Sequence, residues 1–306
     1  PSRTKVLVKM ILFTVDILIC KFMRKRVVWT VHNIISHETE NRTAECRARR
    51  ILAILSDAVI VHSEQAKREV QSFLEKDLSY KMSVIPHGHY LNDYPFFEHR
   101  YSSLKRQLEI SEDTMNILYF GNIRPYKGVE NLLSAFCQTR RTDARLLIAG
   151  KPRASELERQ IRTAAQGDQR IRLYLDFVPD DDVAALFRLA DAVVLPFNQT
   201  LTSGSAILAL GFGKPLLMPS RGSVLGLQNS PDVFFYENVE DLVTHLENIP
   251  SHPEGSDRDE TSTGSALPDW EQVGAATATL YKSKTGKTFC SGPLNGKDQV
   301  RDTIPE

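Results

Sequence analysis

Residues 116–138 have the sequence NILYFGNIRPYKGVENLLSAFCQ, which predicts a strand, a tight turn and a helix. The run NILYF is short and mostly apolar, as a buried strand requires. Over 128–138, Val129, Leu132 and Phe136 recur at the spacing of one helical face. A buried strand that leads into an amphipathic helix is the repeating unit of α/β folds with a parallel sheet.

The same alternation extends through most of the chain, and a polar stretch at 98–114 divides the strands into two groups. We expect an α/β fold of two Rossmann-like, doubly wound parallel-sheet domains. Only about three strands precede the polar stretch, where a sheet usually has about five or six, so the N-terminal domain is expected to be truncated. The further strands are expected at 27–31, 58–62, 82–86, 145–149, 171–175, 192–196 and 215–218.

Local composition predicts the divisions of the chain. Residues 250–268 are rich in Pro, Gly, Ser, Thr and Asp, which favours a flexible loop. Asp269 is expected to cap the next helix, as Ser63 and Asn238 cap helices upstream. The expected segments are an N-terminal domain at 1–100, an interdomain linker at 101–115, a C-terminal domain at 116–249, the loop at 250–268, a helix at 269–283 and a polar tail at 284–306.

Overall composition excludes several classes of function. The 306 residues carry 38 Lys and Arg against 38 Asp and Glu, so no net field favours nucleic acid. The four cysteines are widely separated, without a zinc spacing, and fit free thiols in a reducing compartment. We therefore expect a cytoplasmic protein with no nucleic-acid partner and no metal site.

The N-terminal segment 4–22 is apolar and ends in a basic run at 21–26. Lys9 and Asp16 interrupt it, and each charge near the centre of a membrane span costs about 2.5–3.5 kcal/mol. A packed helix is therefore favoured over a span. Its basic end leaves peripheral contact with an anionic membrane open.

Two segments carry the groups expected to bind a ligand. The turn at 121–128 follows a strand end, where open α/β sheets bind ligands, and offers Arg124 and Lys127 as cations for a diphosphate. The helix start at 200–206, TLTSGSA, leaves backbone N–H groups free for an anion. Each also has an ordinary explanation, namely a turn with solvated cations and a simple Ser/Thr helix cap.

Together these segments resemble the donor domain of the two-Rossmann-domain (GT-B type) glycosyltransferases, the glycosyl transferases group 1. The similar runs are FGNIRPYKGVENLLSAF, LFRLADAVVLPF and GFGKPLLMPSRG, while TVHNIISHE and VIPHGHY resemble segments of the acceptor domain. The helix around Trp270 resembles the C-terminal helix that crosses back to that domain. The resemblance covers roughly residues 27–282.

The resemblance implies transfer of a sugar from a nucleoside diphosphate sugar to a carbohydrate or lipid-linked acceptor, with no obligatory cofactor. It implies that 1–100 is the acceptor domain and 116–249 the donor domain. Lys127 matches a lysine that contacts the donor phosphate, and Arg124 takes over a charge that many members carry at the position of Asn122. The implied diphosphate-binding residues are Gly121, Asn122, Arg124, Lys127, Ser203, Gly204 and Ser205.

On the acceptor side, His32 ends the 27–31 strand and matches a histidine near the transferred sugar, so it is the candidate catalytic residue. Asn33, His37 and Glu38 are candidate acceptor contacts, with a structural histidine and a solvated loop as the alternatives. The segment His87-Gly88-His89-Tyr90 is expected to be structural.

Two departures from the family, the missing glutamates and the short N-terminal domain, leave alternatives open. Many members carry two glutamates around the 200–208 segment, where this chain has Thr200 and Leu208, and Leu208 cannot accept a hydrogen bond from ribose. A nucleotide-sugar epimerase or phosphorylase on the same fold, and a non-catalytic nucleotide-sugar-binding partner protein, therefore remain alternatives. A dehydrogenase is not expected, because no G-x-G-x-x-G follows a strand.

Overall fold

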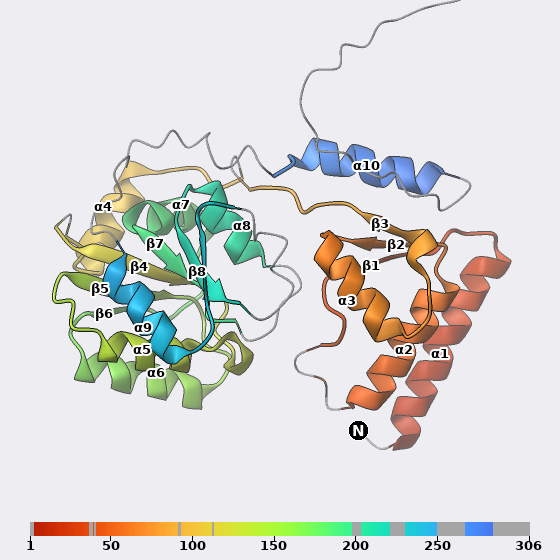
Figure 1. The fold of residues 1–306 in the computed structure, drawn as a ribbon, viewed down its shortest axis with the longest axis horizontal. Coiled ribbons are helices and arrows are strands. Elements are labelled where there is room, and N and C mark those ends of the chain that lie inside the picture. The colour runs from red at the N-terminus through yellow and green to blue at the C-terminus, as the bar shows by residue number, and fades with distance from the viewer. Residues whose placement is uncertain are drawn as a thin grey trace, which may run out of the picture.

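The computed structural model describes residues 3–36, 39, 41–90, 93–111, 113–197, 203–220, 230–249 and 267–283. Its strands form two parallel sheets, one of three and one of six strands (Figure 1). The α/β fold with two Rossmann-like parallel-sheet units is therefore as the sequence predicts.

The three-stranded sheet has the order β1-β2-β3, with β1 at Val28–Thr30, β2 at Ala58–Val61 and β3 at Met82–Val84. α2 (Arg42–Leu55) and α3 (Glu64–Leu74) cover one face, around a core that includes Trp29, Val59 and Met82. A short 3-10 helix, η1 (Ser79–Lys81), leads into β3.

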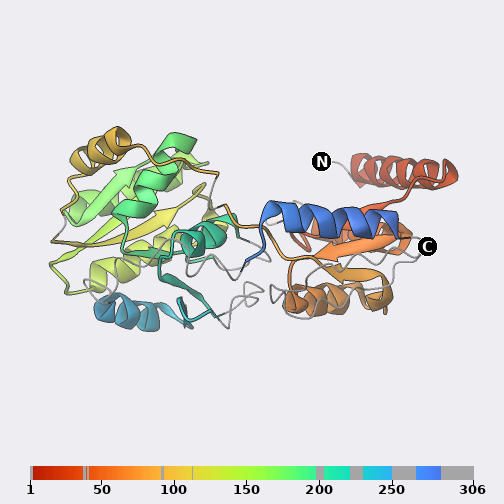
Figure 2. The same ribbon diagram turned by 90° about the horizontal axis from the view of Figure 1, so that it is seen from above.

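The other face of this sheet is covered from the far end of the chain. α10 (Trp270–Lys282) places Leu280 against Ala58, Ile60 and Ile85. Figures 1 and 2 both show α10 lying along the three-stranded sheet although the preceding helix belongs to the other unit. The expected return of the C-terminal helix to the N-terminal unit is thus present in the structure.

The six-stranded sheet has the order β6-β5-β4-β7-β8-β9, in which every neighbouring pair is parallel. α5, α6 and α9 lie on one face and α4, α7 and α8 on the other (Figures 1 and 2). The strands are β4 (Met115–Phe120), β5 (Ala144–Ala149), β6 (Ile171–Tyr174), β7 (Ala192–Val194), β8 (Leu216–Pro219) and β9 (Val233–Tyr236). The helices are α4 (Glu98–Gln107), η2 (Pro125–Lys127), α5 (Val129–Gln138), α6 (Ser155–Gly167), α7 (Asp180–Leu189), α8 (Gly204–Gly211) and α9 (Val239–Asn248).

Three helices begin at the N-cap residues that the sequence predicts. The side chains of Ser63, Asn238 and Asp269 accept a backbone N–H at the starts of α3, α9 and α10. Each oxygen satisfies a donor that the first helical turn leaves without an intrahelical partner.

The segment between the two sheets contains a helix that the sequence analysis did not predict. α4 occupies much of the stretch expected to be the linker at 101–115, and Leu104, Leu108 and Ile110 lie in the core of the six-stranded unit. The helix is mostly polar because it buries only one narrow side, and that composition concealed it. The proposed linker at 101–115 therefore overlaps residues that pack with the C-terminal unit.

α1 (Arg3–Phe22) lies against α2 and leaves much of its apolar surface exposed, including Ile11, Leu12 and Phe22. Among the described residues, no helix has both the length and the hydropathy that crossing a membrane requires.

Candidate functional site

The two predicted ligand-binding segments meet at the carboxyl edge of the six-stranded sheet. β4 runs into Gly121, whose φ of +124° is one that side chains rarely allow. A Cβ atom at Gly121 would lie 3.0 Å from Ser205 Oγ and 3.3 Å from Lys127 Nζ. The ammonium group of the basic turn and the hydroxyl group of the α8 start therefore converge above one glycine.

The backbone between Arg124 and Val129 fixes the position of Lys127. Pro125 begins η2 with the φ that a helical turn needs, and Gly128 ends it with a φ of +68° before α5 starts. A Cβ at Gly128 would lie 2.3 Å from the carbonyl oxygen of Pro196, so only glycine fits against the end of the β7 strand. The turn is thus locked onto the neighbouring strand.

Lys127 is held in a partly apolar setting. Its Nζ lies 4.7 Å from the centre of the Phe197 ring, within the range of a cation–π contact. Burial, together with the nearby charge of Arg124, lowers the pKa of Lys127 to about 8. Among the residues that the structure describes, Lys127 has no carboxylate partner, and a desolvated ammonium group of this kind would gain more from an anionic ligand than a solvated one.

The start of α8 supplies hydrogen-bond donors beside that lysine. Ser203 is the N-cap, and its Oγ accepts the N–H of Ala206 at 3.2 Å. The first turn of a helix leaves further backbone N–H groups without intrahelical acceptors, and Gly204 and Ser205 occupy this turn. The rest of α8 is apolar and buried, so its start is positioned by the core.

Two predicted donor-side residues, and the two positions where the family's glutamates are missing, remain to be placed. Arg124 lies in the same turn as Lys127 and is partly buried, whereas Asn122 is exposed. Leu208, where the resembled family has a ribose-binding carboxylate, is 6% exposed and packs in the core. Thr200 lies outside the described residues.

Histidines line the carboxyl edge of the three-stranded sheet. His32 is exposed and follows β1, and its ring centroid lies 5.2 Å from that of His62, which follows β2. His62 in turn lies 5.6 Å from His87, which follows β3. Asn33 is partly buried next to His32, while His37 and Glu38 lie outside the described residues.

His62 was not among the residues predicted from sequence, and His87 was expected to be structural. The signal that could have found them is the histidine that follows each of three consecutive strands at the same sheet edge. Burial, with the neighbouring imidazoles, lowers the pKa of His62, and burial likewise lowers that of His87.

Tyr90 joins the two edges. Its ring lies 5.6 Å from His87, and a Cβ at Gly204 would lie 3.8 Å from its hydroxyl oxygen. Trp270 packs on the same segment, because a Cβ at Gly88 would lie 2.7 Å from its ring. The row of histidines and the start of α8 are thus bridged by one aromatic side chain.

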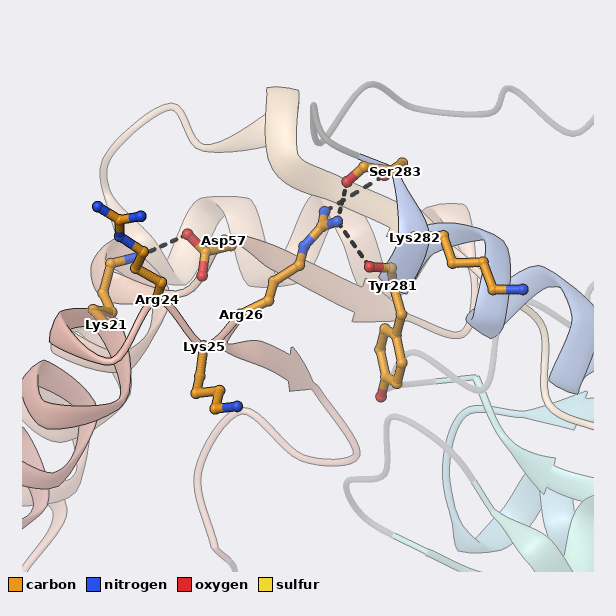
Figure 3. Close-up of a pocket in the computed structure, with 8 residues that line it drawn as sticks. All are labelled: Lys21, Arg24, Lys25, Arg26, Asp57, Tyr281, Lys282 and Ser283. Atoms are coloured by element: carbon orange, nitrogen blue, oxygen red, sulfur yellow. Dashed lines mark hydrogen bonds and ion pairs between the residues drawn. The ribbon is translucent and has the colours of Figure 1, made fainter.

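A pocket of about 510 Å³ lies at the opposite, amino edge of the three-stranded sheet (Figure 3). Lys21 pairs with Asp57 at 2.7 Å, and Arg26 donates to the carbonyl groups of Tyr281 and Ser283. The pocket is further lined by Arg24, Lys25 and Lys282. It is therefore a mainly cationic hollow between the end of α1 and the end of α10.

Within the ranges that the structure describes, no group of three or more His, Cys, Asp or Glu is arranged to hold a metal ion. The charges that face an anionic ligand at the donor edge are those of Lys127 and Arg124.

The family model of glycosyl transferases group 1 matches residues 114–249, which contain both converging segments. Residues 114–249 belong to the glycosyl transferases group 1 family. This glycosyltransferase domain includes the whole six-stranded sheet and the turn at Lys127.

The similarity of this chain to known glycosyltransferases extends beyond this domain. It is 27% identical over 267 residues to a GDP-mannose:glycolipid 4-beta-D-mannosyltransferase of Xanthomonas campestris pv. campestris, covering 85% of this chain and 69% of that protein. It is 28% identical over 179 residues to a lipopolysaccharide 1,2-N-acetylglucosaminetransferase of Salmonella typhimurium, covering 55% of this chain and 46% of that protein.

Solved structures show the same fold. Sucrose-phosphate synthase of Thermosynechococcus elongatus superposes with a TM-score of 0.71 at 19% identity, covering 88% of this chain and 71% of that one. Anabaena HepE, solved with UDP and glucose, has a TM-score of 0.68 at 19% identity, covering 90% of this chain and 76% of that one. The two-domain GT-B fold of the glycosyltransferase is therefore confirmed.

Proposed function

We propose that this glycosyltransferase moves a sugar from a nucleoside diphosphate sugar to a hydroxyl group of a carbohydrate or lipid-linked acceptor. The observation that carries the proposal is the convergence of Lys127 Nζ and Ser205 Oγ above Gly121. A Cβ atom placed at Gly121 would lie 3.3 Å from the first and 3.0 Å from the second. Relatives whose names specify a glycolipid or lipopolysaccharide acceptor support this acceptor class.

The site supplies what the departing diphosphate needs. When the bond between the sugar and the diphosphate breaks, negative charge develops on the bridging oxygen, and fixed cations and amide dipoles lower the barrier. Lys127 and Arg124 provide cations, and the first turn of α8 at Gly204 and Ser205 provides N–H donors. We assign the diphosphate to these groups, with Gly121 leaving space for it and Asn122 at its rim.

The acceptor side of the proposal rests on the N-terminal unit. His32 is exposed at the sheet edge that Tyr90 connects to the start of α8, so we assign it to the transferred sugar or the attacking hydroxyl group. The division into an acceptor domain at 1–100 and a donor domain at 116–249 belongs to the same proposal.

A thermal-shift screen of nucleoside diphosphates and their sugars tests the donor site. A ligand at a hundredfold excess over its Kd stabilises the folded state by about 2.7 kcal/mol. Lys127→Ala should lose the shift that the wild type shows, while its melting temperature without ligand stays close to that of the wild type. Lys76→Ala, which removes an exposed lysine of the other unit, should keep the full shift. An undiminished shift in Lys127→Ala would place the diphosphate elsewhere.

We further propose that the protein contacts anionic membranes peripherally through α1 and the basic pocket that follows it. The exposed apolar side chains of α1 and the cations at Arg24, Lys25 and Lys282 suit the acyl chains and headgroups of such a surface. Vesicle flotation should recover the protein with phosphatidylglycerol-containing vesicles and not with phosphatidylcholine alone. The double variant Lys25→Glu with Lys282→Glu should weaken recovery; equal recovery on both lipids would reject this contact.

A further inference from the structure

The histidines of the three-stranded sheet are aligned by strand register. β1 and β2 pair Thr30 with Ile60, and continuing the same offset places His32 beside His62. β2 and β3 pair Val61 with Val84, so the next step places His62 beside Ile85. Register partners in a parallel sheet point to the same face, so His32 and His62 share the face that α10 covers.

Backbone carbonyl groups fix the tautomers of two of these rings. Nδ1 of His62 lies 2.9 Å from the carbonyl oxygen of Ile85, and Nδ1 of His87 lies 2.8 Å from that of Gly88. A carbonyl oxygen only accepts, so each Nδ1 carries the hydrogen. In the neutral ring, Nε2 is then left as an acceptor.

His62 Nε2 is a buried acceptor with no hydrogen-bond partner among the described residues. A buried polar atom without a partner costs about 1–3 kcal/mol, so such an atom needs an explanation. The imidazole of His32, with its centroid 5.2 Å away and its plane tilted by 35°, is an adjacent ring able to donate a hydrogen. Its exposed side chain can turn towards His62.

We infer that His62 is a positioning residue: its Nε2 accepts the N–H of His32 and so holds His32 in the tautomer whose outer nitrogen is a hydrogen-bond acceptor. That outer nitrogen then receives a hydroxyl hydrogen of the sugar or of the acceptor. The inference rests on the proposed function for the identity of the hydroxyl group. The chain of contacts runs from Ile85 through His62 to His32.

Nitrogen-detected NMR of the free protein, labelled with ¹⁵N-histidine, tests the positioning directly. The chain has eight histidines, and His32→Gln identifies the signals of His32 by their loss. In the wild type, His62 and His87 should show a protonated Nδ1, and His32 should show a single tautomer. A His32 ring that already averages between tautomers in the wild type overturns the inference.

Two substitutions at His62 form a matched pair. Glutamine places its side-chain amide near the position of Nε2 and retains an acceptor there, whereas asparagine places its amide near Nδ1 and retains only the donor to Ile85. His62→Gln should therefore keep the single His32 tautomer, and His62→Asn should make it average. An unchanged His32 tautomer in His62→Asn also overturns the inference.

Kinetics then separate positioning from a structural role. His62→Asn should lower kcat about tenfold, the factor expected from one hydrogen bond, with an unchanged KM for the donor sugar. His62→Gln should recover kcat to within about threefold of wild type, on the same grounds. A His62→Asn enzyme with full kcat contradicts the inference, while a wild type that shows the tautomers but transfers no sugar contradicts only the proposed function.

Discussion

The carboxyl edges of the two parallel sheets place functional groups in the same topological position but use opposite chemistry. At the six-stranded sheet, Lys127 and Arg124 make the edge cationic. At the three-stranded sheet, His32, His62 and His87 make an edge of imidazole rings, and burial lowers the pKa of His62 and His87, which favours their uncharged form. A diphosphate suits the first edge, and hydroxyl groups suit the second.

The difference shows that the residues that follow the strands determine which ligand groups a sheet edge can bind.

The two units also bury different polar groups. The six-stranded unit buries Asp182 completely and neutralises it with Arg100, through bonds of 2.6 and 2.7 Å, and with the hydroxyl of Tyr174 at 2.9 Å. The three-stranded unit buries the ammonium group of Lys81, which donates to the carbonyl groups of Ile54 and Ser56, and its partly buried imidazoles are likewise bonded to carbonyl groups.

Removal of that buried carboxylate is expected to have the largest effect. Asp182→Ala leaves the partly exposed Arg100 and the Tyr174 hydroxyl without their acceptor, so the free energy of unfolding should fall by about 3 kcal/mol, as expected for the loss of hydrogen bonds to a charged group. Urea denaturation measures the loss. The control is Asp181→Ala, which removes an exposed carboxylate from the same helical turn and should cost at most about 1 kcal/mol. Equal losses of stability in the two variants would show that the bonds of Asp182 to Arg100 and Tyr174 do not stabilise the six-stranded unit.

A backbone substitution comes next. Gly128→Ala forces a left-handed φ on alanine and drives its Cβ into the Pro196 carbonyl, so it should destabilise the fold by at least about 2 kcal/mol and weaken nucleotide binding. Gly274→Ala, in α10 with nothing within 4 Å, should instead stabilise by about 0.5–1 kcal/mol. Thermal denaturation with and without nucleotide checks both. A tolerated Gly128→Ala would contradict the locked turn at the cationic edge.

The smallest expected effect is a pH dependence of nucleotide binding. Lys127 has its pKa lowered to about 8 in the free protein, and a bound diphosphate should raise it. Below pH 8 the lysine is charged in both states, so affinity is constant; above pH 8 binding must take up a proton, and affinity falls by up to about tenfold per pH unit. Titration calorimetry between pH 7 and 9.5 measures this.

The comparison for that measurement is Lys127→Met, which should bind weakly at every pH with no break near 8. A wild type whose affinity rises with pH would mean that Lys127 binds in its neutral form. The histidine edge titrates below this range, because burial keeps the pKa of His62 and His87 below the ordinary value.

Much of the fold was predictable because buried strands and helix caps leave local signals. The strand before Gly121 is mostly apolar, and the turn and the α8 start both lie at strand ends, where parallel sheets bind ligands. β9 (Val233–Tyr236) was missed, since its residue Phe234 is exposed and the run is short. The burial of Asp182 was also missed, because an aspartate in a first helical turn ordinarily only complements the helix dipole.

The histidine row could not be derived from local pattern. His32 and His62 become neighbours only through the pairing register of β1 and β2, and register is set by packing across the sheet. The bridge from Tyr90 to Gly204 likewise joins residues of different units. Such contacts depend on how the chain folds as a whole.

The cover that α10 provides has a consequence for synthesis of the chain. Ala58, Ile60 and Ile85 leave the ribosome well before Leu280, which closes over them. At about 5–20 residues per second, this sheet face waits roughly 10–40 s for its cover. The three-stranded unit is therefore begun before the six-stranded unit and completed after it, and a substitution that slows docking of α10 should lower the yield of protein rather than its activity.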